Sequence, residues 1–173
     1  SSFAVWGPAA GEACVLQARN MDFPYDTVYG YAANKHLMIA YSTDGKQQYI
    51  AITWPGFISA GTGMNQSGLA LTTNVGDGLI DPQYYAASYT PTGLIFRRIL
   101  EDVSGSGDLF PQIDQILSAS PRTRSFIAQV SQPQGRGNLV SEIIEADAQG
   151  HEIRAGLSTE PFVFATNHFL QRY

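Results

Sequence analysis

Cysteine, lysine and long apolar runs are scarce in this sequence. Cys14 is the single cysteine among 173 residues, which excludes an internal disulfide framework and a cysteine-based zinc site. Lysine occurs only at Lys35 and Lys46, the formal net charge is -5 and no basic run is present, so we expect no nucleic-acid partner. No stretch approaches the roughly 20 uninterrupted apolar residues of a membrane span, so we expect none.

The residues that are present favour one globular domain. Hydrophobic residues make up 44% of the chain and aromatic residues 12%, so a sizeable core can be buried. Charged residues account for only 14%, against the roughly 25% usual for soluble domains. No glycine-rich phosphate loop, internal repeat or low-complexity segment is present.

Strand patterns occupy both halves of the chain and two helix patterns lie between them. Apolar, β-branched and aromatic segments bounded by turn residues predict the strands. These segments are Phe3–Trp6, Cys14–Arg19, Tyr29–Tyr41, Tyr49–Trp54, Phe57–Met64, Leu69–Asn74, Ser125–Val130, Leu139–Ala146, His151–Arg154 and Phe162–Thr166. Helical spacing of apolar residues predicts one helix that begins at Pro91 and another from Leu109 to Leu117. This order predicts an α+β fold with largely antiparallel sheets.

Both ends of the sequence have strand character. The chain begins with a strand pattern at Ser1–Trp6 and ends shortly after another at Phe162–Thr166. Domain termini are commonly loose and polar. We therefore expect a processed protein, or a piece of a longer one.

The segment Arg19-Asn20-Met21-Asp22 carries the densest polar chemistry. Residues three apart point to opposite faces of a strand, so Arg19 and Asp22 can act together only if the chain turns between them. Pro24 favours such a break. A site at a strand end and a surface ion pair are both compatible with this pattern.

Five motifs in order resemble the N-terminal-nucleophile (Ntn) amide hydrolases related to isopenicillin-N acyltransferase. Penicillin V acylase, bile salt hydrolase and acid ceramidase are more distant relatives of that family. The motifs are the start Ser1–Gly7, the segment Arg19–Asp22, Thr53–Phe57, Gly63–Ala70 and Thr166–Phe169. The resemblance spans the whole chain and implies a four-layer αββα sandwich with antiparallel sheets. That fold normally needs a longer chain, so we expect residues 1–173 to be the amino-terminal part of a single domain.

The resemblance also implies a chemistry. Family members cut their own precursor and expose an N-terminal cysteine, whose α-amine serves as the base for its thiol. An α-amine has a pKa near 7.7–8.0 and can accept a proton near neutral pH. The thiolate attacks a linear amide carbonyl and forms a covalent acyl-enzyme; water then gives hydrolysis, and an amine gives acyl transfer. No cofactor and no metal are implied.

The family's cysteine is the main departure in this sequence. Aligned on the family start, Ser1, Ser2 and Phe3 follow the position of the cysteine. Three explanations remain open: the cysteine directly precedes Ser1, Ser1 itself replaces it as the catalytic nucleophile, or the protein is a non-catalytic binding or assembly module. We favour the first.

The resemblance assigns four further catalytic candidates. Arg19 would favour the thiolate and hold the substrate carbonyl, and Asp22 would orient the terminal amine. Asn74 would donate to the oxyanion, and Asn167 would position the amine or the leaving group. From the residues alone, a turn former before Val75-Gly76 is the favoured interpretation of Asn74, and Asn167 can simply satisfy backbone groups at a strand end.

The remaining polar and aromatic residues give weaker indications. The family's later arginine has no counterpart, because Arg172 lies too close to Asn167. Met21, Phe23 and Trp54 are candidates for an apolar acyl pocket, although they would serve equally as sheet core. His168 and Cys14 are expected to be structural, with Cys14 as a small buried hydrophobe. The expected partners are a small-molecule amide and the remainder of the processed precursor, with an oligomer also compatible; localisation stays open.

Overall fold

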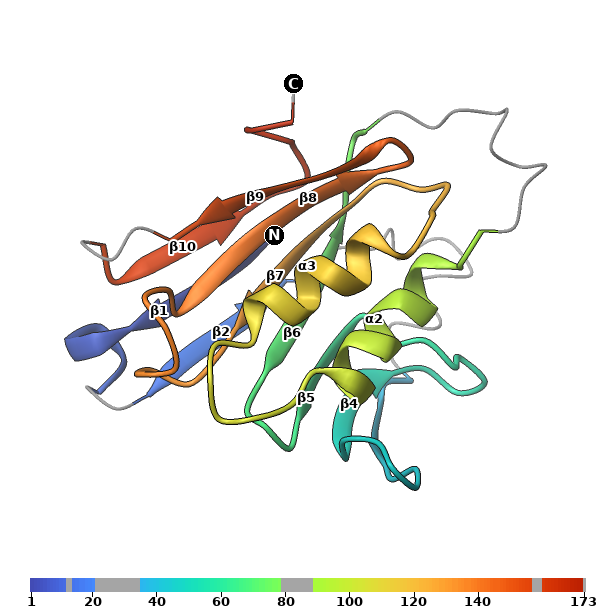
Figure 1. Ribbon diagram of the computed structural model, residues 1–173, viewed down its shortest axis with the longest axis horizontal. Coiled ribbons are helices and arrows are strands. Elements are labelled where there is room, and N and C mark those ends of the chain that lie inside the picture. Colours follow the sequence, from blue (N-terminus) through green and yellow to red (C-terminus); the bar gives the residue numbers. More distant parts are fainter. Residues whose placement is uncertain (12–13, 21–34, 79–88, 157–159, 173) are drawn as a thin grey trace.

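The described part of the chain forms two antiparallel sheets and two α-helices (Figure 1). The computed structural model describes residues 1–11, 14–20, 35–78, 89–156 and 160–172. The strands are β1 (Ser2–Trp6), β2 (Val15–Arg19), β3 (Leu37–Tyr41), β4 (Tyr49–Thr53), β5 (Thr62–Asn65), β6 (Ala70–Val75), β7 (Phe126–Ser131), β8 (Ser141–Asp147), β9 (Gly150–Ala155) and β10 (Phe162–Ala165). The helices are α2 (Thr92–Asp102), α3 (Phe110–Ser118) and the short 3-10 helix η1 (Gly7–Ala10).

The larger sheet follows the chain order and the smaller sheet joins the two ends of the chain. Strands β3 to β9 form a seven-stranded sheet in which each strand pairs with the next in sequence. The three-stranded sheet has the order β10-β1-β2, so the predicted hairpin of β1 and β2 is confirmed. All of these pairs are antiparallel, as the alternation of strand and turn residues predicts.

The seven-stranded sheet carries the helices on one face and the three-stranded sheet over part of the other, at β6, β7 and β8. Helices α2 and α3 lie across one face, and the apolar side chains of their amphipathic stripes are buried there (Figure 1). The three-stranded sheet packs on the other face through a smaller core formed by Ala4, Trp6, Ile127, Ile143, Val163 and Ala165. The described residues therefore form three layers, α, β and β, of the four-layer αββα sandwich expected from the sequence.

The outer surface of the three-stranded sheet is apolar and exposed. Strand alternation directs one set of side chains away from the larger sheet. We call this set the outer apolar face: Phe3, Val5, Leu16, Ala18, Phe162 and Phe164. Four of these residues, Phe3, Leu16, Phe162 and Phe164, are about half exposed, which is uncommon for such a contiguous apolar patch.

Three expectations from the sequence need correction. The strand predicted over Phe57–Met64 begins only at Thr62, as β5. Cys14 is exposed and precedes β2, which begins at Val15, so it is not a buried hydrophobe. Pro91 is the N-cap residue of α2 rather than its first helical residue, and its fixed φ still suits the start of the helix. The predicted helix over 109–117 is confirmed as α3, which begins and ends one residue later.

Asn65 joins the β5–β6 turn to the end of α2, and its loss should destabilise the fold. Its buried Nδ2 donates to the carbonyls of Leu100 (3.2 Å) and Val103 (2.8 Å), while its Oδ1 accepts from the Leu69 N–H (3.1 Å). Asn65→Ala should lower the unfolding free energy by about 2–4 kcal/mol, because buried polar groups lose their partners. Urea unfolding measures this, with Gln66→Ala at the exposed neighbouring position as the control. A loss equal to that of Gln66→Ala would contradict the expected role.

Glu142 should make stability depend on pH. Burial and, to a smaller extent, the nearby Asp108 and Asp114 carboxylates together raise the pKa of this β8 carboxyl from 4.5 to about 7. The folded protein thus binds more protons than the unfolded chain between these values, so the unfolding free energy falls as pH rises from about 4.5 to about 7. Glu142→Gln should remove this fall and stabilise the protein at about pH 8 by about 1–3 kcal/mol. Urea unfolding at acidic and basic pH tests this; the exposed Glu152→Gln should leave the pH dependence unchanged.

Candidate active site

Three strand ends meet beside the start of β1. Antiparallel pairing places Ser2 opposite Arg19 at the end of β2 and opposite Ala165 at the end of β10. The end of β6 reaches the same place, because Asn74 Nδ2 donates to Ser2 Oγ at 3.1 Å. Residues that are far apart in the sequence are thereby gathered around the first residues of the chain.

Arg19 brings a partly buried positive charge to this place. Its Nη1 donates to Thr62 Oγ1 at 3.1 Å and to the Gly61 carbonyl at 3.4 Å. Within the described part of the chain, Nε is buried without a hydrogen-bond acceptor, and no carboxylate forms an ion pair with the guanidinium. Burial lowers the pKa of Arg19 from its ordinary value. A desolvated guanidinium of this kind favours an anion at its free edge.

Asn74 lies within a central strand, not in a turn. It occupies the next-to-last position of β6 and pairs with Ile127 of β7. Its side chain is 6% exposed and faces the three-stranded sheet. The turn-former interpretation is therefore wrong. An amide nitrogen carries two hydrogens, so Nδ2 can donate to a second acceptor besides Ser2 Oγ.

Asn167 lies two residues beyond the end of β10 and faces the end of β6. Its Nδ2 donates to the Val75 carbonyl at 2.7 Å, and its side chain is exposed. The bond does satisfy a backbone group at a strand end, as the simpler interpretation predicts. It also fixes the amide next to Asn74, the residue that precedes Val75.

Ser1 is exposed at the start of this arrangement. Its carbonyl accepts from the Asn20 N–H at 2.8 Å, which continues the β1–β2 pairing by one residue. Side chains alternate along a strand. Because the Ser2 side chain points toward Asn74, the Ser1 side chain lies on the side of the outer apolar face.

The remaining sequence candidates fall in different places. Met21, Asp22 and Phe23 lie outside the described residues. Trp54 follows β4, and its ring centroid is 5.4 Å from that of His36 and 5.7 Å from that of Phe57. The loop after Trp54 ends at Gly61, whose carbonyl contacts Arg19.

Two residues that the motifs do not single out belong to this site. Thr62 is the hydroxyl partner of Arg19, and Thr73 Oγ1 donates to the same Gly61 carbonyl at 3.0 Å. Threonine in a strand has no local pattern that separates this role from ordinary sheet packing, so the sequence could not identify them.

Cys14 and His168 are placed away from this chemistry. Cys14 adjoins Val15, which pairs with Trp6 at the opposite end of the hairpin from Ser2. His168 is exposed, with its Nδ1 3.7 Å from Asp77 Oδ2. Neither side chain contacts Arg19 or Asn74 within the described ranges.

An apolar groove runs along the edge strand β2. It has a volume of about 690 Å³. Its walls include residues of β1, β2, β5 and β6, among them Phe3, Leu16, Ala18, Met64 and Ala70. The groove borders Ala18, the residue before Arg19, so an apolar group could extend from the site along β2.

The described residues contain neither a metal-ligating cluster nor a membrane-spanning helix. No group of three or more His, Cys, Asp or Glu side chains in these segments is arranged to hold a metal ion. None of the helices described is long and apolar enough to cross a membrane.

Comparison with known proteins identifies the fold. No protein-family description and no curated protein matches the sequence. Among solved structures, the chain is similar to the Caenorhabditis elegans ortholog of N-acylethanolamine-hydrolyzing acid amidase, with a TM-score of 0.75 and 14% sequence identity. The match covers 98% of this chain and 70% of that one. At this identity the likeness shows the fold without selecting the family related to isopenicillin-N acyltransferase, and the chain has the antiparallel α+β fold of the Ntn hydrolases.

Proposed function

We propose that the protein hydrolyses a linear amide bond through a covalent acyl-enzyme. The observation that carries this proposal is the convergence of Arg19, Asn74 and Asn167 on the start of β1. The site offers a cation and two amide donors around one strand end. Such a set suits a reaction that develops negative charge on a carbonyl oxygen. The fold shared with an amidase agrees with this chemistry.

The nucleophile in this proposal is a cysteine directly before Ser1. Strand alternation supports it, because a residue preceding Ser1 would return to the side of the strand that carries Ser2. That side faces Asn74 and adjoins Arg19. Ser1 as nucleophile fits less well, since its side chain lies on the opposite side of the strand.

The proposed roles follow from these positions. The Arg19 guanidinium favours the thiolate over the thiol, because a nearby cation lowers a thiol pKa. Asn74 Nδ2 donates to the oxyanion of the tetrahedral intermediate, and Asn167 positions the terminal amine or the leaving group. Asp22 orients the terminal amine as hydrogen-bond acceptor. Trp54, Met21 and Phe23 contribute to the apolar acyl pocket.

An acyl-enzyme trapping experiment tests the proposal. The mature protein is mixed with an N-acyl p-nitroanilide, quenched in acid, and analysed by intact mass and by peptide mapping of its N-terminus. We expect one acyl group on the N-terminal residue and release of nitroaniline. Adding hydroxylamine separates acyl transfer, which gives a hydroxamate, from hydrolysis alone. An N-terminus that is Ser1, with no adduct, would reject the thiol mechanism; Ser1→Ala then tests the serine alternative.

The outer apolar face supports a further part of this proposal, the remainder of a processed precursor as partner. A face of this kind is normally covered in a stable protein. A denaturing gel of the purified protein should show two fragments that co-elute in gel filtration. An uncleaved single chain would instead favour a non-catalytic binding or assembly module, and elution at twice the expected mass would indicate a dimer.

A further inference from the structure

The segment that follows β10 is held against the larger sheet by two buried acids. Glu145 and Asp147 belong to β8, and both side chains are 0% exposed. The Arg172 guanidinium forms an ion pair with Asp147. The backbone N–H groups of Leu170 and Gln171 donate to Glu145 Oε2 at 2.9 and 2.8 Å.

Glu145 accepts a third backbone hydrogen bond from the same segment. The Arg172 N–H donates to the same Oε2 at 3.3 Å, while Oε1 lies 3.7 Å from Arg154 Nε. Three successive N–H groups that converge on one charged oxygen form strong, charge-assisted bonds. Burying a carboxylate is costly unless it is hydrogen-bonded, and the three bonds from residues 170–172 offset that cost.

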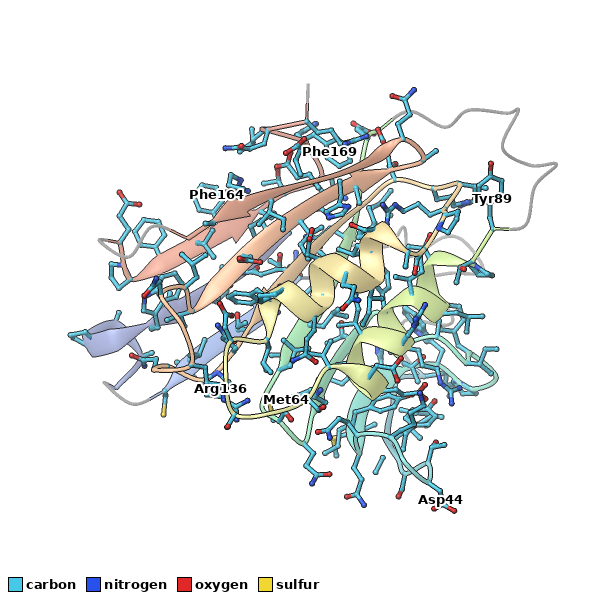
Figure 2. All side chains as sticks on the ribbon, viewed as in Figure 1. Asp44, Met64, Tyr89, Arg136, Phe164 and Phe169 are labelled. Atoms are coloured by element: carbon cyan, nitrogen blue, oxygen red, sulfur yellow. The ribbon has the colours of Figure 1, made fainter. Side chains whose placement is uncertain are left out.

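An aromatic wedge lies between this anchor and Asn167. Phe169 packs beside the end of β6, where Figure 2 labels it. A Cβ added at Gly76 would lie 2.6 Å from Phe169 Cε1, and one added at Gly78 would lie 2.6 Å from Phe169 Cε2. The close approach of this ring thus requires glycine at both positions.

The cross-strand register relates the anchor to the candidate active site. Asn74 pairs with Ile127, and Ile127 pairs with Glu145, so Asn74 and Glu145 stand in one row, about 10 Å apart across β7. The segment 167–172 bridges this distance: its first residue bonds Val75 and its last three bond Glu145.

We propose that Glu145 is a positioning residue for Asn167. Its carboxylate holds residues 170–172 in place through their backbone N–H groups. This fixes the preceding Phe169 ring against Gly76 and Gly78. The Asn167 amide is thereby held against the Val75 carbonyl, next to Asn74 in the sequence of β6. The catalytic consequence rests on the proposed function of Asn167, whereas the positioning itself does not.

Nuclear magnetic resonance tests the positioning without any substrate. The measurements are the side-chain amide signal of Asn167 and the exchange rates of the 170–172 backbone amides. Glu145→Gln keeps the size of the side chain and removes its charge, so exchange should become about tenfold faster and the Asn167 signal should shift. Gly76→Ala displaces Phe169 and should shift the same signal. Glu152→Gln, at the exposed register partner of Glu145, should shift neither.

Kinetics with an amide substrate completes the test. Glu145→Gln should lower kcat at least about fivefold with KM within about twofold, and in an Asn167→Ala background it should have no further effect. Faster exchange with an unchanged Asn167 signal would overturn the proposal, because Glu145 would then be structural only. If the wild type hydrolyses no amide, the proposed function fails and the resonance data still decide the positioning. If Glu145→Gln does not fold, Glu145→Asp, whose shorter side chain holds the 170–172 amides less closely, replaces it in the same measurements with the same expected and overturning results.

Discussion

Asn74→Ala should lower kcat for amide hydrolysis by about 100- to 1,000-fold, with KM changed by less than about threefold. The reason is that an oxyanion donor acts on charge that develops only in the transition state. Asn74 Nδ2 is fixed by its bond to Ser2 Oγ and by a central strand, so the donor is already oriented before the substrate arrives. Steady-state kinetics on a chromogenic anilide measures both constants.

The sequence contains a matched control for this prediction. Asn65 is a buried asparagine at the end of β5, a neighbouring strand, and the same change to alanine removes three hydrogen bonds there. Asn65→Ala should therefore cost stability, while the kcat of the folded protein stays within about threefold of wild type. If Asn74→Ala retains kcat within about tenfold, Asn74 does not supply the oxyanion donor.

Local patterns predict the elements of this fold well and its long-range contacts poorly. The hairpin of β1 and β2, the two amphipathic helices and the antiparallel sheets follow from turn residues and apolar spacing. Whether Asn74 ends a strand or begins a turn depends on β7, which pairs with it from about fifty positions further along the chain. No local pattern encodes that pairing, and it decides the role of the residue.

The buried acids also show that local sequence patterns do not predict long-range contacts. Glu142 and Glu145 lie in one strand and point to opposite faces, one toward the helical layer and one between the sheets. Period-two alternation predicts the opposite directions but not the burial, which depends on what each face meets. Cys14 fails for a related reason: the apolar run around it suggests a strand interior, whereas β2 begins one residue later.

Arg19 is the second residue whose replacement should have a large effect. Its Nη1 is held by Thr62 and Gly61, and its Nε has no acceptor among the residues described. Desolvation of this guanidinium is unfavourable for the fold, as the lowered pKa of Arg19 indicates. A buried guanidinium at Arg19 is therefore better explained by a function in which an anion binds to it.

Arg19→Met should lower kcat/KM at neutral pH by about 100-fold or more and shift the acidic limb of the pH–rate profile upward by at least about one unit. Loss of the cation would raise the pKa of the proposed nucleophilic thiol, so the thiolate would form only at higher pH and the rate would recover partly there. The same variant should unfold at an equal or higher urea concentration, because an apolar side chain of similar length replaces a buried charge. Arg98→Met, an exposed arginine of α2, should change neither profile. An unchanged acidic limb together with lost stability would mean that Arg19 holds Gly61 and Thr62 in place and does not act on the nucleophile.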